Sequence, residues 1–496
     1  MYYSSIMFNR KKELLAAIIM VLLILASCQK IAYKDDPNIQ DDPIDYVWDT
    51  STVVQVTLSG TSITVDPAVA TISGSKLTIT EAGTYNITGS LTNGQIIVNS
   101  QDESSVRLIL NGVNITCSNN APIYIKDSKK TIIDLAAGTS NYLTDGTTYS
   151  TTDEPKAALF SNSDLTIFGS GYLTVTGKYK DGISTDDGLL IKSGIISVTS
   201  VDDGIRGKDC VIIKSGKITV VSGGDGIKST NTESSLLGYI SIDSALVNIT
   251  TTAGDGVAAG TNLSIGDGSY TITTGGGAGT ISTGGRGPGG GGSSGYSGTI
   301  SEKGLKGGVS VVITKGTFNI NSADDAIHSN GSVTINGGTL ALSTGDDGIH
   351  ASSAITINGG SVNITKCYEG IESALITVNS GDVSVASVDD AFNATKGSAT
   401  ESNDGSWLYI KGGNITVNAS TGDGLDSNGS VAMTAGTVIV QGPQSSPEVG
   451  FDVNGTFNVS GGLLIGSGPN SGNMIEAIST TSSQYGVKAT ISSTLA

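Results

Sequence analysis

Apolar and polar residues alternate in short runs that recur along the chain at a constant interval. The apolar positions between Val333 and Ile349 are repeated 22 residues later between Ile355 and Ile371, and the next copy starts one residue early, at Ile376. Within each copy, Gly-Gly, Ser-Gly or Asp-Gly pairs separate the runs. Alternation with a period of two is typical of half-buried β-strands, and these pairs are typical of turns. The pattern therefore predicts an all-β chain.

A repeat of this length is too short to bury a core by itself, so successive copies must stack. With three short strands in each copy, we predict a right-handed parallel β-helix, a solenoid whose coils of ~22 residues rise by the ~4.8 Å spacing of adjacent strands. The alternative is a β-sandwich or a barrel, and those folds lack so regular an internal period.

The same pattern runs from about Val53 to the C-terminus, which predicts one domain over residues 47–496. A glycine-rich stretch at 275–308 cannot pack a core and is expected to form an exposed loop. Cys117, Cys210 and Cys367 have no Cys-x-x-Cys spacing, so they are expected to pack among the strands.

The N-terminus has the pattern of an export signal. Residues 9–12 are mainly basic, and residues 14–26 form an apolar run of 13 residues, too short to span a membrane. The run ends in Leu-Ala-Ser-Cys, which resembles a bacterial lipobox with Cys28 as the lipidated residue. We therefore predict a lipoprotein signal peptide at 1–27, a flexible spacer at 29–46 and a secreted lipoprotein on the outer membrane, exposed at the cell surface. A plain signal peptide with an incidental cysteine is the alternative.

Charged residues recur at one point of the repeat. When the copies are aligned on their Asp-Gly-Ile turn, one position, which we call the acidic column, reads Asp181, Asp203, Asp225, Asp255, Lys303, Asp325, Asp347, Glu369, Asp390 and Asp423. The preceding position adds Asp202, Asp324, Asp346 and Asp389, and further along the turn Asp187 and Asp209 align with each other. Stacked carboxylates ~5 Å apart repel each other by roughly 1 kcal/mol per pair in water, and by more where water is excluded.

Part of this repulsion is offset by the chain's own cations. The companion position, three residues after each column residue, holds Arg206, Lys228 and Lys306, but beside the acid pairs at 324–325, 346–347 and 389–390 it holds only His328, His350 and Asn393. Hard oxygen ligands from adjacent turns are what calcium prefers. The predicted calcium ligands are Asp181, Asp187, Asp202, Asp203, Asp209, Asp225, Asp324, Asp325, Asp346, Asp347, Glu369, Asp389 and Asp390.

Two alternatives concern these same residues. Asp-Gly is a good turn former, because aspartate tolerates turns and glycine supplies a positive φ, but this explains one acid per turn and not two. His328 and His350, the two histidines of the chain, are expected to stack as neighbouring rings; a catalytic or transition-metal site would need a third ligand of the usual zinc type.

The residues at 303–306, 322–331, 345–350, 368–372 and 388–393 together resemble the signature of bacterial calcium-binding β-helix carbohydrate-binding proteins, a family related in fold to family 9 pectate lyases. The resemblance covers about residues 53–470. It implies that the stacked acids bind calcium and that the protein recognises plant-type or acidic polysaccharides.

The first hypothesis is therefore non-catalytic, calcium-dependent binding of a polysaccharide, either acidic and polygalacturonate-like or cellulose-like. A net charge of −18 repels nucleic acid and anionic lipids, so membrane contact is expected only through the N-terminal lipid. One alternative is a calcium-dependent pectate-type lyase, with Lys303, Lys306 or Arg206 as the base that removes the C5 proton. Another is a structural surface or adhesion rod without a glycan ligand.

Overall fold

A computed structural model describes residues 41–66, 69–150, 154–279, 298–397, 402–469 and 477–490. The predicted signal peptide, Cys28 and most of the predicted spacer lie outside these residues. Within the described ranges, no helix is long and apolar enough to span a membrane.

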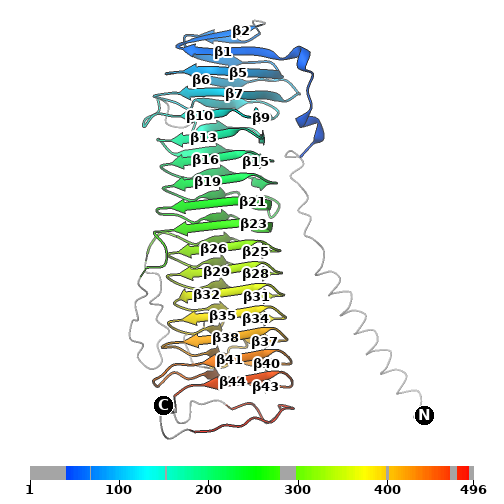
Figure 1. Cartoon of the computed structure of the whole chain (residues 1–496), viewed down its shortest axis with the longest axis vertical. Coiled ribbons are helices and arrows are strands. Elements are labelled where there is room, and N and C mark those ends of the chain that lie inside the picture. Colours follow the sequence, from blue (N-terminus) through cyan, green and yellow to red (C-terminus); the bar gives the residue numbers. More distant parts are fainter. Residues whose placement is uncertain are drawn as a thin grey trace, which may run out of the picture. The chain divides into compact units, whose positions relative to one another are not determined.

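The strands of the unit Asp41–Ala496 follow one another in a stack, from β2 and β1 to β44 and β43 (Figure 1). They form a 28-stranded sheet, here sheet A, and a 16-stranded sheet, here sheet B. Most repeats contribute one strand to sheet B and the next two strands to sheet A, and we call this unit a layer. Two short 3-10 helices, η1 (Pro43–Tyr46) and η2 (Thr50–Thr52), precede the first strand.

Sheet B contains β3 (Thr71–Ser73), β4 (Lys76–Ile79), β6 (Gln95–Asn99), β8 (Ile123–Asp127), β11 (Ala157–Ser161), β14 (Asp181–Thr185), β17 (Ile205–Gly207), β20 (Ile227–Ser229), β22 (Val257–Ala259), β24 (Leu305–Gly307), β27 (Ile327–Ser329), β30 (Ile349–Ala351), β33 (Ile371–Ser373), β36 (Phe392–Ala394), β39 (Leu425–Ser427) and β42 (Phe451–Val453). Sheet A contains β1 (Val54–Gly60), β2 (Ser62–Asp66), β5 (Gly83–Leu91), β7 (Val106–Thr116), β9 (Thr131–Leu135), β10 (Ser140–Thr144), β12 (Leu165–Gly169), β13 (Tyr172–Gly177), β15 (Gly188–Ile191), β16 (Ile195–Ser200), β18 (Cys210–Ile213), β19 (Lys217–Ser222), β21 (Tyr239–Thr251), β23 (Asn262–Thr274), β25 (Ser310–Ile313), β26 (Thr317–Ser322), β28 (Ser332–Ile335), β29 (Thr339–Thr344), β31 (Ala354–Ile357), β32 (Ser361–Cys367), β34 (Leu375–Val378), β35 (Asp382–Ser387), β37 (Trp407–Ile410), β38 (Asn414–Ala419), β40 (Ser430–Met433), β41 (Thr437–Gln441), β43 (Phe457–Val459) and β44 (Leu463–Ser467).

The strand pairing corrects the predicted fold class. The long strand β7 pairs with both β9 and β10, and the long strand β21 pairs with both β18 and β19. These pairings close a ring of ten parallel strands in sheet A, in the order β7, β9, β12, β15, β18, β21, β19, β16, β13 and β10. The predicted open right-handed parallel β-helix of three short strands per coil is therefore wrong: sheet A contains a closed parallel barrel, and the other strands lie outside it.

The physical reason is that some corners stay hydrogen-bonded instead of breaking into turns. In β21 the ladder to β23 continues through the corner, where Ser244 pairs with Asp267 and Ala245 with Gly268. Two predicted short strands thereby become one strand of 13 residues. The apolar spacing is the same in both cases, so it does not distinguish a broken corner from a continuous one.

The core lies between the sheets and is filled by the inward-facing half of each strand. β29 has the burial pattern of a half-buried strand, with Leu340 and Leu342 buried and Thr339 and Ala341 exposed. Leu340 pairs with Val362 in the next layer, 22 residues along. The apolar positions of successive layers therefore lie one above another. Cys117, Cys210 and Cys367 are buried among the strands and form no disulfide with one another.

Two residues at the described end of the predicted spacer contact the strands. Asp45 is buried and pairs with Lys130 at 2.5 Å, while Tyr46 places its ring 4.9 Å from that of Phe168. The predicted loop at 275–308 is also shorter than expected at its C-terminal end, because Leu305–Gly307 form β24 of sheet B.

Candidate functional site

The acidic column lies where the chain enters sheet B. Here the column residue is followed by a glycine or alanine and then by the first apolar residue of the strand. The glycines do not have a positive φ, contrary to the turn interpretation. A Cβ at Gly204 would instead lie 2.2 Å from Cγ1 of Val220, and one at Gly348 would lie 2.6 Å from Cδ1 of Ile364. Small residues are therefore needed because the backbone passes close to the core.

The column acids bind the backbone of the next layer. One carboxylate oxygen of each of five column acids accepts a hydrogen bond from the amide of the column residue one layer along, which satisfies a backbone donor at a turn. These bonds are Asp225 N to Asp203 Oδ1 at 2.9 Å, Asp255 N to Asp225 Oδ1 at 2.6 Å, Lys303 N to Asp255 Oδ1 at 2.8 Å, Asp347 N to Asp325 Oδ1 at 3.2 Å and Asp423 N to Asp390 Oδ1 at 2.7 Å. One acid per turn thus has a structural role.

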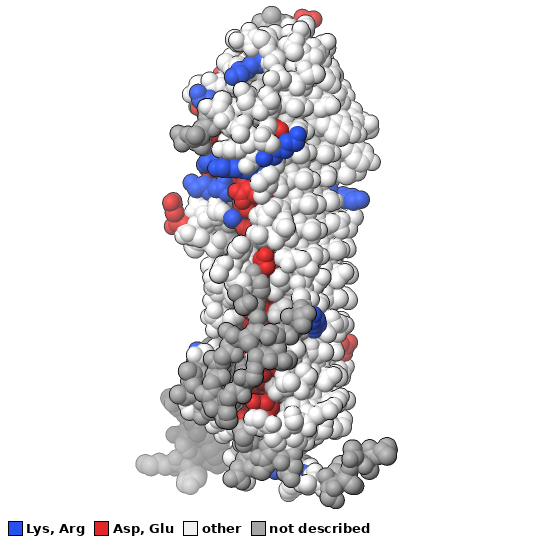
Figure 2. Space-filling view, turned by 90° about the vertical axis from the view of Figure 1, so that its left-hand side faces the viewer, with Lys and Arg blue, Asp and Glu red and all other residues white. Residues whose placement is uncertain are grey.

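The companion positions align as the sequence predicted. They are the middle residues of the sheet B strands, and their registers pair Arg206 with Lys228, Lys306 with His328, His328 with His350, and His350 with Glu372. These side chains therefore follow one another beside the acidic column. Figure 2 shows acidic side chains along this face, with lysine and arginine gathered towards the N-terminal layers.

The layers from Asp203 to Asp325 contain built-in cations, and we call them the lysine-paired half. Lys228 Nζ lies 3.1 Å from Asp203 Oδ2 and 2.8 Å from Asp225 Oδ2. Lys306 Nζ lies 3.0 Å from Asp255 Oδ2. Burial lowers the pKa of Lys228, but the charges of Asp225 and Asp203 outweigh it, so the net shift is upward.

Lys303 supplies a cation to the acid pair at 324–325, where the companion position holds only His328. Nζ of Lys303 lies 2.6 Å from Asp324 Oδ1 and 2.7 Å from Asp325 Oδ2. Lys303 is the column residue of the layer before Asp325, and its side chain reaches the acids of the Asp325 layer. Although burial opposes it, the two carboxylates raise the pKa of Lys303 above its usual range. The pair already holds a cation and does not require calcium.

The layers from Asp347 to Asp423 differ, and we call them the acidic half. Their companion positions are His350, Glu372, Asn393 and Asp426, none of which is a lysine or arginine. Burial raises the pKa of Asp347 and of Glu369 well above the usual range, and neighbouring carboxylates add to the shift. Burial, followed by the charge of Asp390, raises the pKa of Asp423 to about 9.

The structure brings only some of the predicted ligands together. Carboxylate oxygens of Asp181, Asp202 and Asp203 lie within 4.8 Å of one another, as do those of Asp324, Asp325 and Asp346. Burial and the charges of Asp203 and Asp202 raise the pKa of Asp181 to about 7. Three acidic residues can supply several of the oxygen ligands that calcium takes, so the first group fits this ion.

Asp187 and Asp209 do not join the column. They follow β14 and β17, at the opposite ends of these strands from Asp181 and Asp203. Oδ1 of Asp209 accepts a hydrogen bond from Asn231 Nδ2 at 2.6 Å, and Asp209 N donates to Asp187 O at 3.1 Å. The two residues lie in adjacent layers, as their alignment predicted, and apart from the column acids.

Sequence reasoning missed two charged neighbours. Asp452 pairs in register with Asp426 and continues the companion position by one layer. Its spacing of 26 residues, lengthened around Pro443 and Pro447, hid it from the repeat. Asp186 was also missed: its Oδ1 lies 3.3 Å from NH1 of Arg206, so this arginine binds outside the column.

Two hollows open on the column. One, of about 310 Å³, lies where the two halves meet, and its lining includes Lys303, His328, His350, Asp347 and Glu372. The other, of about 480 Å³, lies in the lysine-paired half around Ala258, the small companion residue between Lys228 and Lys306.

The sequence model of the family described as "Carbohydrate-binding domain-containing protein" matches residues 73–348. A curated protein of the same description from Acetivibrio thermocellus is 35% identical over 194 residues, which is 38% of this chain and 65% of that protein, so the chain spans less than two thirds of its length. A solved structure of a polysaccharide lyase-like protein from C. thermocellum, a gadolinium derivative, is 28% identical with a TM-score of 0.42, and the match covers 61% of this chain and 96% of that one.

Proposed function

The chain belongs to the family of carbohydrate-binding domain-containing proteins, and on that premise we propose that it binds polysaccharide through calcium ions held on the acidic column, without catalysis. The observation that carries the proposal is the group Asp181, Asp202 and Asp203. Asp181 and Asp203 are buried and Asp202 is exposed, so the group reaches from the strand to the surface. Such a set matches the hard-oxygen preference of calcium.

The elevated pKa of Asp181 supports this assignment. Burial raises the pKa of Asp181 to about 7, and the negative charges of Asp203 and Asp202 contribute to that rise. A divalent cation relieves the same repulsion without a proton. Bound calcium would supply positive charge at the surface, and Asp181, Asp202 and Asp203 would hold it.

The same chemistry accounts for an acidic glycan on an acidic protein. With a net charge of −18, the chain repels uronate carboxylates at long range. Calcium at the exposed Asp202 would attract them, and the ammonium groups of Lys228 and Lys306 beside the larger hollow would add to that attraction. We therefore propose an acidic, polygalacturonate-like polymer as the first substrate class and a cellulose-like polymer as the second.

The lyase alternative loses its first candidate base. Lys303 holds two carboxylates and its pKa is raised, so it remains an ammonium ion and cannot accept the C5 proton. Arg206 donates to Asp186 and Ser184, and Lys306 pairs with Asp255. These contacts favour charge balance over proton transfer.

The sequence also supports a proposal about location. We propose that Cys28 is lipidated and tethers the protein to the outer membrane, at the cell surface. Mass spectrometry of the protein from its native membrane should find a diacylated N-terminal Cys28, and an unmodified N-terminus would contradict this.

The calcium proposal is tested by thermal unfolding and pull-downs in calcium and in chelator. A site filled at 100 times its Kd stabilises the fold by about 2.7 kcal/mol, so a clear rise in Tm is expected. Binding to polygalacturonate should require calcium, and D181N together with D202N should abolish both effects. The matched control is D267N, which removes an exposed acid paired with Lys315 at 3.4 Å outside the column. A calcium response that survives in D181N/D202N, or glycan binding in chelator, would contradict the proposal.

A further inference from the structure

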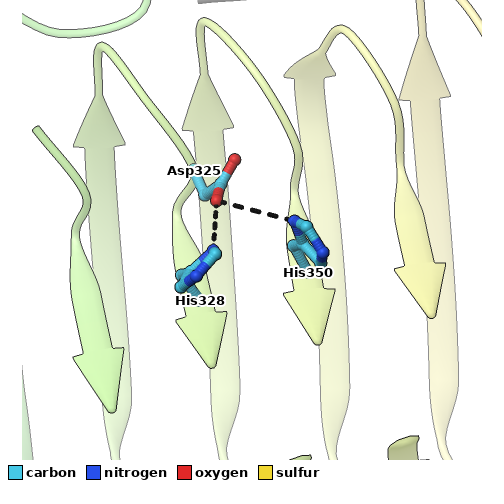
Figure 3. A group of neighbouring side chains, drawn as sticks. All are labelled: Asp325, His328 and His350. Carbon is cyan, nitrogen blue, oxygen red and sulfur yellow. Dashed lines mark hydrogen bonds and ion pairs between the residues drawn. The ribbon is translucent and has the colours of Figure 1, made fainter. Parts of the chain in front are cut away.

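The chain's two histidines lie side by side at the smaller hollow. His328 is on β27 and His350 on β30, with ring centroids 4.9 Å apart, and Asp325 faces both rings (Figure 3). Two groups of potential ligands meet here: Asp325, His328 and His350, and Asp347, His350 and Glu372, each with ligand atoms within 4.8 Å of one another. His350 belongs to both groups.

His328 is already committed to protein partners. Its Nδ1 lies 2.6 Å from Asp325 Oδ2 and its Nε2 lies 3.0 Å from Asn330 Oδ1. Both ring nitrogens of His328 therefore already have protein partners, and a metal ion would have to displace one of them. Two ligands of one zinc ion, each about 2.05 Å from it, lie roughly 3.3 Å apart in tetrahedral geometry, so a contact of 2.6 Å leaves no room for an ion.

His350 has the opposite surroundings. Its Nδ1 lies 3.5 Å from Asp347 Oδ2 and 4.0 Å from Asp325 Oδ2, and among the described residues its ring makes no hydrogen bond with either. The separation of 3.5 Å is the one that two ligands of a small divalent ion adopt. Glu372 pairs with His350 in register, so both side chains point outward from sheet B.

We propose that His350 Nδ1, Asp347 and Glu372 bind a divalent transition-metal ion of the zinc class, at a site separate from the proposed calcium group of Asp181, Asp202 and Asp203. An imidazole nitrogen with two carboxylates suits zinc, cobalt or nickel, whereas calcium takes oxygen. His328 is a positioning residue, because it holds Asp325 at the edge of the site. The hollow of about 310 Å³ leaves the ion open to an outside ligand on the face where the glycan is proposed to bind.

The first test is titration of the untagged full chain with Co²⁺, followed by its visible absorption. One equivalent should produce the bands of a four- or five-coordinate ion, and Zn²⁺ should abolish them. H350Q and E372Q should each lose the bands. The matched variant H328Q should retain them, with a cobalt affinity lowered by at most about 10–100-fold, as is typical when a residue that orients a metal ligand is changed. Loss in H328Q equal to that in H350Q, or bands that persist in H350Q, would overturn the proposal.

A second measurement does not depend on how the variants fold. Because the chain has two histidines, imidazole ¹⁵N spectra should show two ring systems. Zinc should shift the Nδ1 signal of one ring and leave the signals of the other ring unchanged. No shift, or displacement of Co²⁺ by an equal concentration of Ca²⁺, would overturn the proposal. D181N/D202N should leave the cobalt bands unchanged, so failure of the calcium proposal is distinguishable from failure of this one.

Discussion

The lysine-paired half and the acidic half share one backbone design and differ in how their charge is balanced. In both, a column carboxylate accepts the amide of the next layer, as Asp203 does from Asp225 and Asp390 does from Asp423. In the first half Lys228, Lys303 and Lys306 lie against these acids. In the second, the companion residues are a histidine, an amide and further acids. Both halves therefore use a carboxylate to bind the backbone of the next layer, but only the lysine-paired half supplies lysines that balance its charge.

The family match divides the column at almost the same place. It ends at residue 348, so it includes Asp181, Asp202, Asp203 and all of the lysine-paired half. Beyond Asp347 the acidic half lies outside it. Carbohydrate binding is thus proposed first for the matched layers, while the unmatched layers carry the greater excess of negative charge.

The largest expected effect comes from removing Lys303, one of the three lysines of the lysine-paired half. K303M keeps a long unbranched side chain but removes the ammonium group that contacts Asp324 and Asp325, which are both buried. Breaking a buried pair in this way costs about 3–5 kcal/mol of unfolding free energy. Urea unfolding measures it, with K315M, at an exposed ion pair, as the control expected to change stability by about 0–1 kcal/mol. An equal effect of both variants would remove the distinction between buried and surface pairs.

The next effect is a pH dependence of the calcium-free protein, dominated by the acidic half. The pKa of Asp423 is raised from 3.8 to about 9 and that of Asp181 to about 7, so the folded state favours their protonated forms. This stability is fully present below pH 3.8 and is lost as pH rises through the folded values, by an amount of the order of a few kcal/mol. Melting in chelator should therefore fall between about pH 4 and 9, and D423N should flatten the upper part. A Tm that rises over this pH range in chelator would contradict the claim that the acidic half loses stability as its carboxyl groups ionise.

A smaller effect is expected from neutralising one acid of the acidic half. In the wild-type protein, Asn393 Nδ2 donates a hydrogen bond of 2.9 Å to Glu369 Oε2. The E369Q side chain keeps an oxygen that can accept this bond, and the substitution removes one of several carboxylate charges that repel each other. In chelator at pH 8 we expect a gain of about 1 kcal/mol, the scale of one carboxylate repulsion. The control is D382N, an exposed acid on β35, which should leave the Tm unchanged. Destabilisation by E369Q would show that its charge is already compensated.

The smallest effect is expected outside the column. D209N should leave the calcium response unchanged, because Asp209 lies at the opposite end of its strand and accepts a hydrogen bond from Asn231. The change in stability should be within about 1 kcal/mol, the worth of one hydrogen bond. Calorimetric titration with calcium compares the variant with the wild type. A weakened calcium affinity would return Asp209 to the ligand set.

Much of the site could be predicted because a repeat converts sequence spacing into spatial proximity. The 22-residue interval was enough to place His328 beside His350 and Lys306 beside His328. It could not show that Lys303 reaches both acids of the following layer, because the direction of a long side chain is set by the carboxylates around it. Nor could it separate Asp187 and Asp209 from the column, since alignment along the stack does not report the distance across a strand.

The sequence by itself determined the register of the layers, because burial of alternate apolar residues allows only one alignment of each strand on the next. The tertiary structure decided which corners remain hydrogen-bonded, and so whether sheet A closes into a ring, because that depends on backbone pairing through residues such as Ser244 and Ala245. It also decided which acids are balanced, because charges interact through space. Lys303 neutralises Asp325, whereas Glu369, in an aligned position two layers further, lies among carboxylates.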